Sequence, residues 1–576
     1  MDLTAKHWRV ALASATISML LATLILTFGP AGVDRPAHQY QLWLFGHFGF
    51  TLWDNFWYAG RYSFVGYSIL FYPLSQLIGM GTTVVMSVGL GVWAVSMMVS
   101  RLIPTRLLLA SLLATLLWPT EVLSGAYPYM LSQALGAVVV LLVLADGRLG
   151  IGDYAGGTCS HSIGDRTRKT FIVVLLLLQL GASPLGVLFV ELFLIARFIR
   201  LADLDLGRAG VSIRGIISSF YKAIDLPLVA GSAVALVGLV SSKLFPTMAY
   251  YPFWWTDLAE IVAFVLLVTL VLPRRGFRFF RIALGVYLLV CLVAFFVPTE
   301  LGSNVARLSD ASLFGSILIV SLIWARAGVL RRIFSAFLIL FSAYWWSTLV
   351  TSALTDPQVA ARSTSAYWSG AVSWLEGHLG TSYRVELVDP SDHSGDYYLA
   401  KSGIPLVRGW FRQADFPTDA LLYRSSLTAT AYLAWLHDLS VQFVALPLGP
   451  YDFSSQKEAQ LVRRLSVTKD CLTQVANAGE VTIYSVCNPV AIVSGGNAVA
   501  MGRTSITARL PAGGTYRLSI HFSPYLIPST GCLYRSSNGL TLWNVTSHAV
   551  ASVRFHLSLT RMLTVFFSDP SSVCAG

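Results

Sequence analysis

Four residues able to do chemistry lie in one long, aromatic-rich segment, Gly29–Leu74: Asp34, His38, Asp54 and Arg61. Asp34 and His38 are four residues apart, so on a helix they would share one face. His38 could then orient Asp34 or bind a phosphate, and the planar guanidinium of Arg61 suits a phosphate because its fork gives two parallel contacts. Asp54 could hydrogen-bond sugar hydroxyls. This segment is the strongest candidate site in the chain.

Each of these residues also has a purely structural interpretation. Asp34 precedes a proline and could cap a helix, since Asp is a favoured N-cap residue and Pro is enriched early in helices. His38 could make a structural hydrogen bond. Asp54 and Trp57 could anchor a turn at the membrane interface, and Arg61 could pair with Asp54 or with lipid headgroups. Both interpretations stay open at the level of sequence.

The composition places this segment in a membrane protein. Hydrophobic residues make up 55% of the 576 residues and charged residues 12%, with a mean hydropathy of +0.65. A soluble domain carries about 25% charged residues. The net charge of +11 does not indicate nucleic acid, because residues 1–350 hold 24 Lys and Arg against 15 Asp and Glu, while residues 351–576 hold 16 against 14. The basic excess therefore belongs to the apolar part of the chain.

Eleven apolar cores are candidates for membrane-spanning helices, which need about 20 largely apolar residues. The run Phe171–Arg197 is divided at its Ser-Pro pair, because proline prevents a helix from continuing. The cores are Val10–Gly29, Met80–Ser100, Leu107–Trp118, Met130–Ala145, Phe171–Ala182, Leu185–Arg197, Leu226–Ser242, Leu258–Leu272, Ile282–Val297, Ala311–Ala325 and Ile333–Ala353.

The distribution of cations predicts the orientation of these spans. With a cytoplasmic N-terminus, the inside segments of residues 1–350 contain 20 Lys and Arg and the outside segments contain 4. Cytoplasmic loops carry such an excess of cations. We therefore expect a multi-pass protein of the plasma membrane, with Gly29–Leu74 and the C-terminal domain outside the cytoplasm.

Beyond residue 353 the long apolar runs stop and alternating patterns begin. Strands are expected at Tyr383–Val388, Val441–Leu446, Glu480–Val486, Ser505–Leu510, Thr515–Phe522 and Leu563–Phe567, and helices at Leu427–Leu439 and Ser455–Leu465. The expected domains are a transmembrane bundle over 1–353 with a large first outer loop at 30–74, a mixed α/β region over 354–490, and a β-rich, sandwich-like region over 491–576.

Four cysteines lie in the expected outer domain: Cys471, Cys487, Cys532 and Cys574. An even number of cysteines in an oxidising compartment predicts two disulfides. Of the three possible pairings, Cys471 with Cys487 and Cys532 with Cys574 is the simplest, because each bond stays within one subregion. A metal site is not favoured here, since the chain has no CxxC spacing.

The order of these parts resembles the GT-C superfamily of membrane glycosyltransferases: a first span, a large outer loop with an early acid, a multi-span bundle and a C-terminal outer domain. Within Asp34–Leu74, the pattern Asp-x-x-x-His, Gly-Phe-x-x-Trp-Asp-x-x-Trp, Gly-Arg-Tyr and Phe-Tyr-Pro-Leu looks like the bacterial membrane proteins called 6-pyruvoyl-tetrahydropterin synthase-related. The stretches Asp392–Tyr398 and Arg408–Gln413 are similar to segments of the same proteins.

The resemblance implies transfer of a sugar from a polyprenyl-phosphate carrier to a cell-envelope glycan or glycolipid acceptor, among membrane lipids and without nucleic acid. It implies that Asp34 is the general base which deprotonates the acceptor hydroxyl. The candidate catalytic residues are Asp34, His38 and Asp54, and the candidate substrate-binding residues are Arg61, Trp57, Tyr72, Arg307 and Glu260. No residue is assigned to a metal. A divalent metal is possible as a cofactor, although Arg35 stands where the family often has a second acid.

Two other functions fit the same sequence. A non-catalytic glycan-binding or scaffold protein of envelope assembly would also need an outer domain and a membrane bundle. A transporter of lipid-linked glycans usually shows two repeated halves with matched broken helices. The single helix pair broken by proline has no counterpart elsewhere in the sequence, which disfavours the transporter.

Overall fold

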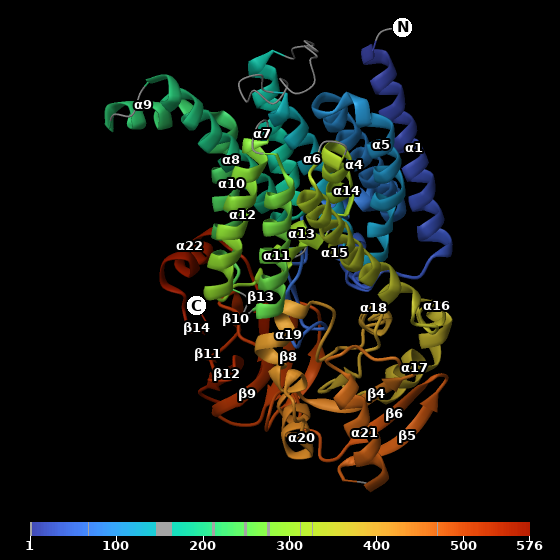
Figure 1. The fold of residues 1–576 in the computed structure, drawn as a ribbon. Coiled ribbons are helices and arrows are strands. Elements are labelled where there is room, and N and C mark those ends of the chain that lie inside the picture. The colour runs from blue at the N-terminus through green and yellow to red at the C-terminus, as the bar shows by residue number, and fades with distance from the viewer. Residues whose placement is uncertain are drawn as a thin grey trace. The chain divides into compact units, whose positions relative to one another are not determined.

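The computed structural model describes residues 3–66, 68–145, 164–209, 213–246, 250–273, 277–310, 313–324, 327–468 and 470–575. The chain divides into two compact units. The helical unit comprises Met1–Pro30, Ser68–Leu239 and Tyr250–Thr355, and the mixed unit comprises Ala31–Tyr67, Val240–Ala249 and Asp356–Gly576. Both units are drawn in Figure 1.

The helical unit is built from the long apolar runs of the sequence. Because a helix satisfies its own backbone hydrogen bonds, it is the form in which such runs can cross lipid. Its helices are α1 (Leu3–Phe28), α3 (Phe71–Ile78), α4 (Met80–Leu102), α5 (Leu107–Leu117), α6 (Tyr127–Leu144), α7 (Asp165–Ala182), α8 (Pro184–Ala209), α9 (Ile213–Ala223), α10 (Leu226–Leu244), α11 (Trp255–Val271), α12 (Arg278–Phe296), α13 (Arg307–Asp310), α14 (Leu313–Ile323) and α15 (Val329–Leu354).

Seven helices in the described residues are long and apolar enough to cross a membrane. They are Ala5–Phe28, Met80–Leu102, Pro104–Ser124, Tyr127–Leu144, Leu226–Leu244, Arg278–Phe296 and Val329–Leu354. The expected class, a multi-pass membrane protein, is confirmed. The count of eleven is not: the other four expected cores fall on α7, α8, α11 and α14, which are shorter or carry more charge.

The expected break between Phe171 and Arg197 is present. Helix α7 ends at Ala182, Ser183 is extended with φ −162° and ψ 126°, and α8 begins at Pro184. The residue before a proline is driven out of the helical region in this way. The hydroxyl of Ser132, from α6, donates to the Ser183 carbonyl at 2.9 Å and so satisfies a group that the break leaves open.

The mixed unit contains one four-stranded sheet with both parallel and antiparallel pairs, in the order β3-β4-β6-β5. Its strands are β3 (Arg384–Leu387), β4 (Val441–Pro447), β5 (Leu472–Ala478) and β6 (Val481–Val486). Only β3 and β4 are parallel. The helices of this region are α16 (Val359–Arg362), α17 (Ser365–His378), α18 (Ser394–Lys401), α19 (Arg412–Thr418), α20 (Ala429–Asp438) and α21 (Gln456–Thr468).

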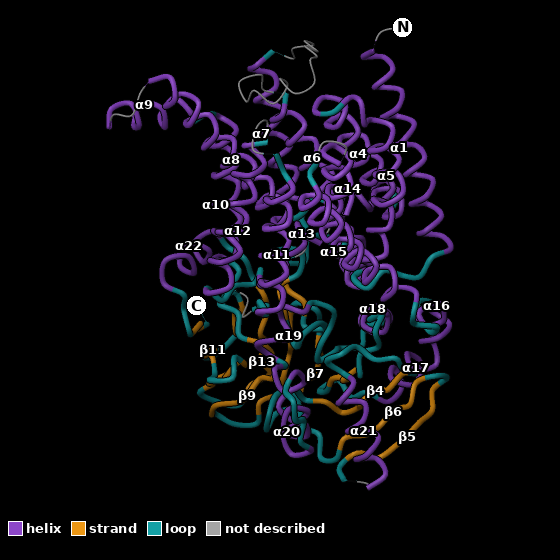
Figure 2. The backbone as a smooth tube through the Cα atoms, viewed as in Figure 1, coloured by secondary structure: helices purple, strands orange, loops and turns teal. Residues whose placement is uncertain are grey.

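Two further four-stranded antiparallel sheets follow, in the orders β10-β13-β8-β7 and β14-β11-β12-β9, and they share one apolar core. Figure 2 shows the strands of these sheets in orange. The strands are β7 (Asn497–Met501), β8 (Ser505–Leu510), β9 (Gly514–His521), β10 (Leu526–Pro528), β11 (Cys532–Arg535), β12 (Leu540–Val545), β13 (Ala549–Phe555) and β14 (Ser572–Cys574). The strand-rich C-terminal region is thereby confirmed.

One expected strand is wrong. Leu563–Phe567 belongs to a helix, α22 (Leu559–Ser568), whose N-cap Ser558 accepts a hydrogen bond from the Arg561 backbone. A short apolar run fits a strand or a helix equally well by pattern. The N-cap serine decides for the helix here, because it satisfies one of the amide groups that a helix start leaves open.

Both disulfides favoured by the sequence are formed, Cys471 with Cys487 and Cys532 with Cys574. The second bond joins opposite residues of the neighbouring strands β11 and β14. It closes a loop of 42 residues and so ties the last strand to its sheet. Crosslinks of this kind stabilise a fold mainly by restricting the unfolded chain.

The segment after the first helix belongs to the mixed unit. It forms α2 (Arg35–Phe48) and a two-stranded hairpin of β1 (Trp53–Asp54) and β2 (Arg61–Tyr62). Trp53 and Tyr62 lie in the core shared by the two antiparallel sheets. The hairpin is thus anchored by its aromatic side chains to strands more than 400 residues later in the sequence.

Candidate functional site

Three extended segments run parallel in the mixed unit and end at one edge. Strand β3 pairs with β4, and Val385 forms a parallel bridge with Leu406 on the other side. Ligands of α/β proteins gather outside the carboxyl ends of parallel strands, because the chains leaving neighbouring strands bring their side chains together there. We call the residues that follow the three segments, 388–393, 408–412 and 448–452, the carboxyl edge.

The carboxyl edge is densely charged and buried. Its ionisable residues are the buried Asp389, Asp392, His393, Arg408 and Asp452 and the half-buried Arg412. Arg412 donates two hydrogen bonds to the carboxylate of Asp452, at 2.8 and 2.7 Å. Arg408 donates to Glu386 at 3.0 Å and to Glu458 at 3.1 Å. Buried charges require such partners.

His393 stands at the centre of this edge in a strained conformation. Its backbone φ is 54°, which a residue with a side chain rarely adopts, and its side chain is fully buried. Its Nδ1 contacts the Asp389 carboxylate, and its ring stacks on Trp410 with centroids 3.4 Å apart. Strained residues of this kind cluster at functional sites.

Trp410 connects this edge to the first candidate residue. Its Nε1 donates a hydrogen bond of 2.8 Å to Oδ1 of Asp34. Asp34 is half-buried and lies just before α2, and its side chain makes no capping hydrogen bond to that helix. The cap interpretation of Asp34 is therefore not realised. Its carboxylate is instead held in one orientation by the indole, as a proton acceptor must be.

His38, Asp54 and Arg61, the other three candidate residues of the segment Gly29–Leu74, are also buried in the mixed unit. His38 lies on the buried face of α2. Asp54 is inaccessible and accepts hydrogen bonds from the Tyr40 hydroxyl and from the Phe56 amide, the latter at 3.0 Å. Burial raises the pKa of Asp54, although Arg503 at 3.4 Å opposes that shift. Asp54 thus holds the hairpin in place.

Two expected substrate-binding residues pack against the carboxyl edge. The guanidinium of Arg61 lies over the Phe411 ring, 3.5 Å from its centroid. Trp57 is buried beside Gly409, so closely that a methyl group added to that glycine would lie 1.9 Å from the indole nitrogen. The structure therefore brings Asp34, Trp57 and Arg61 to the same run of residues, 408–412.

The remaining expected residues belong to the helical unit. Tyr72 is fully buried in α3 and packs edge-on against Phe71. Glu260 lies half-buried in α11. Arg307, at the start of α13, donates to the Asn304 side chain at 3.2 Å and lies over the Tyr129 ring at 5.3 Å.

Opposite pKa shifts divide the acids of the carboxyl edge into two kinds. Burial works against ionisation of Asp452, yet the two hydrogen bonds from Arg412 hold its pKa well below the usual range. Burial raises the pKa of Asp389 and of the neighbouring Asp396, despite the nearby His393 in the first case. Asp452 is therefore an ionised partner of Arg412, whereas Asp389 and Asp396 lack a comparable cation among the described residues.

The sequence interpretation assigned no role to Asp389, His393, Asp396, Trp410 or Asp452. The stretches around 392–398 and 408–413 stood out only by resemblance. A signal was present nonetheless: an Asp-x-x-x-His-x-x-Asp run directly after an apolar alternating segment. What remained hidden was the pairing of three parallel segments that brings this run to Trp410.

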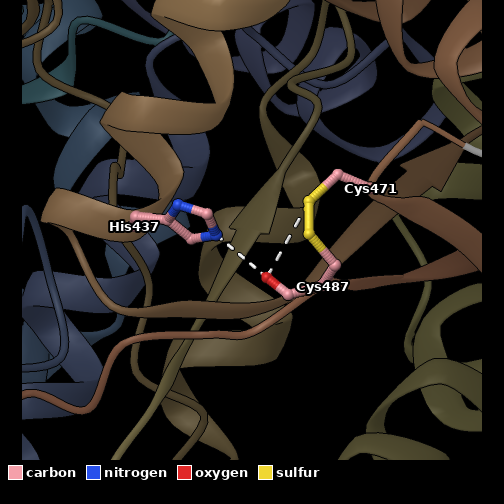
Figure 3. A group of neighbouring side chains, drawn as sticks. All are labelled: His437, Cys471 and Cys487. Carbon is pink, nitrogen blue, oxygen red and sulfur yellow. Dashed lines mark hydrogen bonds between the residues drawn. A yellow bond between two sulfur atoms is a disulfide. The ribbon is translucent and has the colours of Figure 1, made fainter.

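Among the described residues, two groups of side chains have donor atoms close enough together for a metal ion. One is His437, Cys471 and Cys487, shown in Figure 3. Its sulfur atoms are joined in a disulfide, and His437 Nε2 hydrogen-bonds the Cys487 carbonyl at 2.9 Å, so this group is structural. The other is Asp389, His393 and Asp396 at the carboxyl edge.

No protein-family model matches this chain, and no curated protein is similar to it in sequence. Among solved structures, it is similar to the oligosaccharyltransferase AglB of Archaeoglobus fulgidus in complex with an inhibitory peptide and a dolichol-phosphate. The TM-score is 0.42 and the identity 12%, over 84% of this chain and 75% of that one.

Two crystal structures of the Archaeoglobus fulgidus oligosaccharyltransferase give similar values at 12% identity. The apo form has a TM-score of 0.42 over 76% of this chain and 69% of that one. The complex with Zn and sulfate has a TM-score of 0.41 over 84% and 74%. A likeness at this level identifies no activity.

Proposed function

We propose that this protein transfers a sugar from a polyprenyl-phosphate carrier to a cell-envelope glycan or glycolipid, on the outer face of the plasma membrane. In this proposal the N-terminus is cytoplasmic and the mixed unit is extracytoplasmic, as the distribution of Lys and Arg favours. We also propose that the transmembrane bundle ends at residue 353 and that the mixed α/β region ends at residue 490. The proposal builds on the resemblance of the order of the chain's parts to that of GT-C membrane glycosyltransferases.

The single observation that carries the proposal is the setting of Asp34. Its carboxylate is half-buried, makes no capping bond, and accepts a 2.8 Å hydrogen bond from Trp410. A general base must be held still while it remains within reach of the hydroxyl it deprotonates. Asp34 removes the proton of the acceptor hydroxyl as that oxygen attacks the anomeric carbon, and the lipid phosphate leaves with the electron pair.

The donor side is assigned to cations and aromatic residues. Arg61 keeps the face of its guanidinium on Phe411, and the edge of that group is the part that binds phosphate oxygens in bidentate fashion. Trp57 supplies an apolar wall beside it. Arg307, Tyr72 and Glu260, which belong to the helical unit, are also proposed as substrate-binding residues. His38 and Asp54 support Asp34 from α2 and the hairpin.

Replacing Asp34 with asparagine tests the base. Asn keeps the size and polarity of the side chain but cannot take up a proton, and general-base catalysis contributes about 10²–10⁴-fold. Sugar transfer from a polyprenyl-phospho-sugar should fall by that order in the purified protein, while KM for the lipid donor changes little. The measurement is the initial rate with radiolabelled donor in detergent or nanodiscs.

Arg61→Lys provides the matched change on the donor side. It retains the charge and loses the planar fork, so KM for the donor should rise more than kcat falls. An Asp34→Asn protein that transfers sugar at the full rate would eliminate the base assignment. A wild-type protein inert with every polyprenyl-linked sugar would instead favour the non-catalytic scaffold, which the engaged carboxylates of Asp34 and Asp54 also allow.

A further inference from the structure

We infer that Asp389, His393 and Asp396 bind one divalent transition-metal cation of the Zn²⁺ or Mn²⁺ kind in the mixed unit. Each residue offers one ligand atom, and these atoms lie within 4.8 Å of one another. Ligands placed about 2.0–2.2 Å from a single ion are separated by roughly 3–4 Å, so small side-chain movements suffice. The inference does not depend on sugar transfer.

Unsatisfied polar atoms point to a missing ligand. Within the described part of the chain, Asp389 Oδ1, His393 Nε2 and Asp396 Oδ2 are buried and have no hydrogen-bond partner. The three residues are exposed by 5%, 0% and 2%. Buried polar atoms without partners are costly and rare in native folds. Three of them in one cluster, all able to donate electrons to a metal, are explained together by one cation.

The local charge balance supports the same conclusion. Four other acids of this region have guanidinium partners: Asp452 with Arg412, Asp392 with Arg362, and Glu386 and Glu458 with Arg408. Among the described residues, no guanidinium forms an ion pair with Asp389 or Asp396.

The backbone holds the three ligands on one short turn after β3. Asp389 follows the strand, His393 adopts its positive φ at the start of α18, and Asp396 lies in the first turn of that helix. Trp410 stacks on the imidazole and fixes its plane. A strained histidine persists only when its surroundings over-determine it, and coordination adds such a constraint.

The ligand set selects the class of ion. One imidazole with two carboxylates suits Zn²⁺, Mn²⁺ and related cations, whereas Mg²⁺ and Ca²⁺ favour oxygen ligands alone. Asp452 Oδ1 lies 3.9 Å from His393 Nε2 and stands close enough to influence the site. A bound cation would neutralise two carboxylates beside the indole that orients Asp34, and so stabilise the whole carboxyl edge.

The test measures metal binding directly in the full-length protein in detergent. The protein is stripped with a chelator and titrated separately with Zn²⁺, Mn²⁺, Mg²⁺ and Ca²⁺. We expect one equivalent of Zn²⁺ or Mn²⁺ after desalting, by elemental mass spectrometry, and a higher Tm with the metal. Pulsed EPR of the Mn²⁺ form should show coupling to an imidazole nitrogen, which His393→Gln removes.

Asp396→Asn and His393→Gln should each weaken binding at least tenfold. Asp419→Asn is the matched control: Asp419 is a buried acid of the same unit, it accepts a hydrogen bond from Trp435 at 3.1 Å, and it lies outside the ligand set. The control should bind metal like the wild type.

Wild-type protein that retains no metal, ligand variants that bind unchanged, or tighter binding of Mg²⁺ or Ca²⁺ would each overturn the inference. None of these outcomes depends on an activity assay, so they are separate from the fate of the proposed function.

Discussion

At the scale of single residues, the indole of Trp410 is the contact on which the arrangement of the site depends. It donates to Asp34 with its nitrogen and stacks on His393 with its face. An Asp with one oxygen held by a rigid donor loses rotational freedom, and a fixed proton acceptor reacts faster than a mobile one. The two roles of Trp410 can be separated by substitution, because only one of them needs the N–H group.

Trp410→Phe keeps an aromatic face against His393 and removes the donor to Asp34. A hydrogen bond to a charged group contributes about 1.5–3 kcal/mol, so kcat for sugar transfer should fall roughly 10- to 100-fold. KM for the donor should change little because the stack on His393 remains, and the Tm should fall by no more than the loss of this one hydrogen bond accounts for. Steady-state kinetics and thermal unfolding of the two proteins check this. A loss confined to Tm, with kcat intact, would leave Trp410 a packing residue only.

At the scale of elements, the carboxyl edge depends on the close approach of the segment 408–412 to the hairpin region. Gly409 permits that approach, since any side chain there would overlap the Trp57 indole. The Tyr58 hydroxyl adds hydrogen bonds to the carbonyls of Gly409 and Phe411, at 2.7 and 3.0 Å. A glycine is required here for space rather than for backbone freedom.

Gly409→Ala should therefore destabilise the mixed unit by about 1–3 kcal/mol, the usual cost of overpacking. The segment that carries Arg408, Trp410 and Arg412 must shift, so transfer activity should fall with stability. Gly377→Ala is the control: a methyl group at Gly377, in α17, meets no atom within 4 Å. The control should be neutral or slightly stabilising, because alanine favours a helix over glycine. Equal Tm values for the two variants would contradict the packing argument.

At the scale of the whole molecule, buried ionisable groups make the stability of the mixed unit depend on pH. His521 is half-buried at the end of β9, and its loss of solvent, together with the nearby Arg384, lowers its pKa to about 4 from the usual 6.5. Between pH 4 and pH 6.5, His521 is mostly protonated in the unfolded chain and mostly neutral in the folded protein. The contribution of His521 to stability is therefore complete above about pH 6.5 and is lost as the pH falls towards 4.

His521→Gln removes this titration. The variant should lose less stability than the wild type on acidification from pH 7 to pH 4, by an amount on the order of 3 kcal/mol. Denaturant unfolding of both proteins at matched pH values gives the difference. The carboxyl groups titrate in both proteins, so their contributions cancel in the difference between the two stability curves. Parallel stability curves would show that His521 takes up its proton at the same pH in the folded and the unfolded chain.

Composition and periodicity were enough to predict the class of this protein. The long apolar runs predicted membrane helices, because a helix that is apolar on all sides must be surrounded by lipid or protein. Alternation of apolar and polar residues correctly predicted five of the six expected strands, because successive side chains of a strand point to opposite faces of the sheet. Two disulfides were expected from the even number of cysteines in the outer domain, and the simplest of the three possible pairings is the one that forms. The short run Leu563–Phe567 was predicted wrongly, since its few apolar residues fit both periods and only the Ser558 cap decides for a helix.

The assembly of the candidate site was decided by the tertiary structure alone. Asp34 and Trp410 are 376 residues apart in the chain, yet they share a hydrogen bond. They meet because the chain around Leu406 pairs in parallel with β3, and because residues 31–67 belong to the mixed unit. The same pairing leaves Asp389, His393 and Asp396 buried together, each with one polar atom that has no hydrogen-bond partner within the part of the chain the structure describes. Local sequence encodes which face of an element is apolar, but contacts between distant segments depend on how all those faces pack at once.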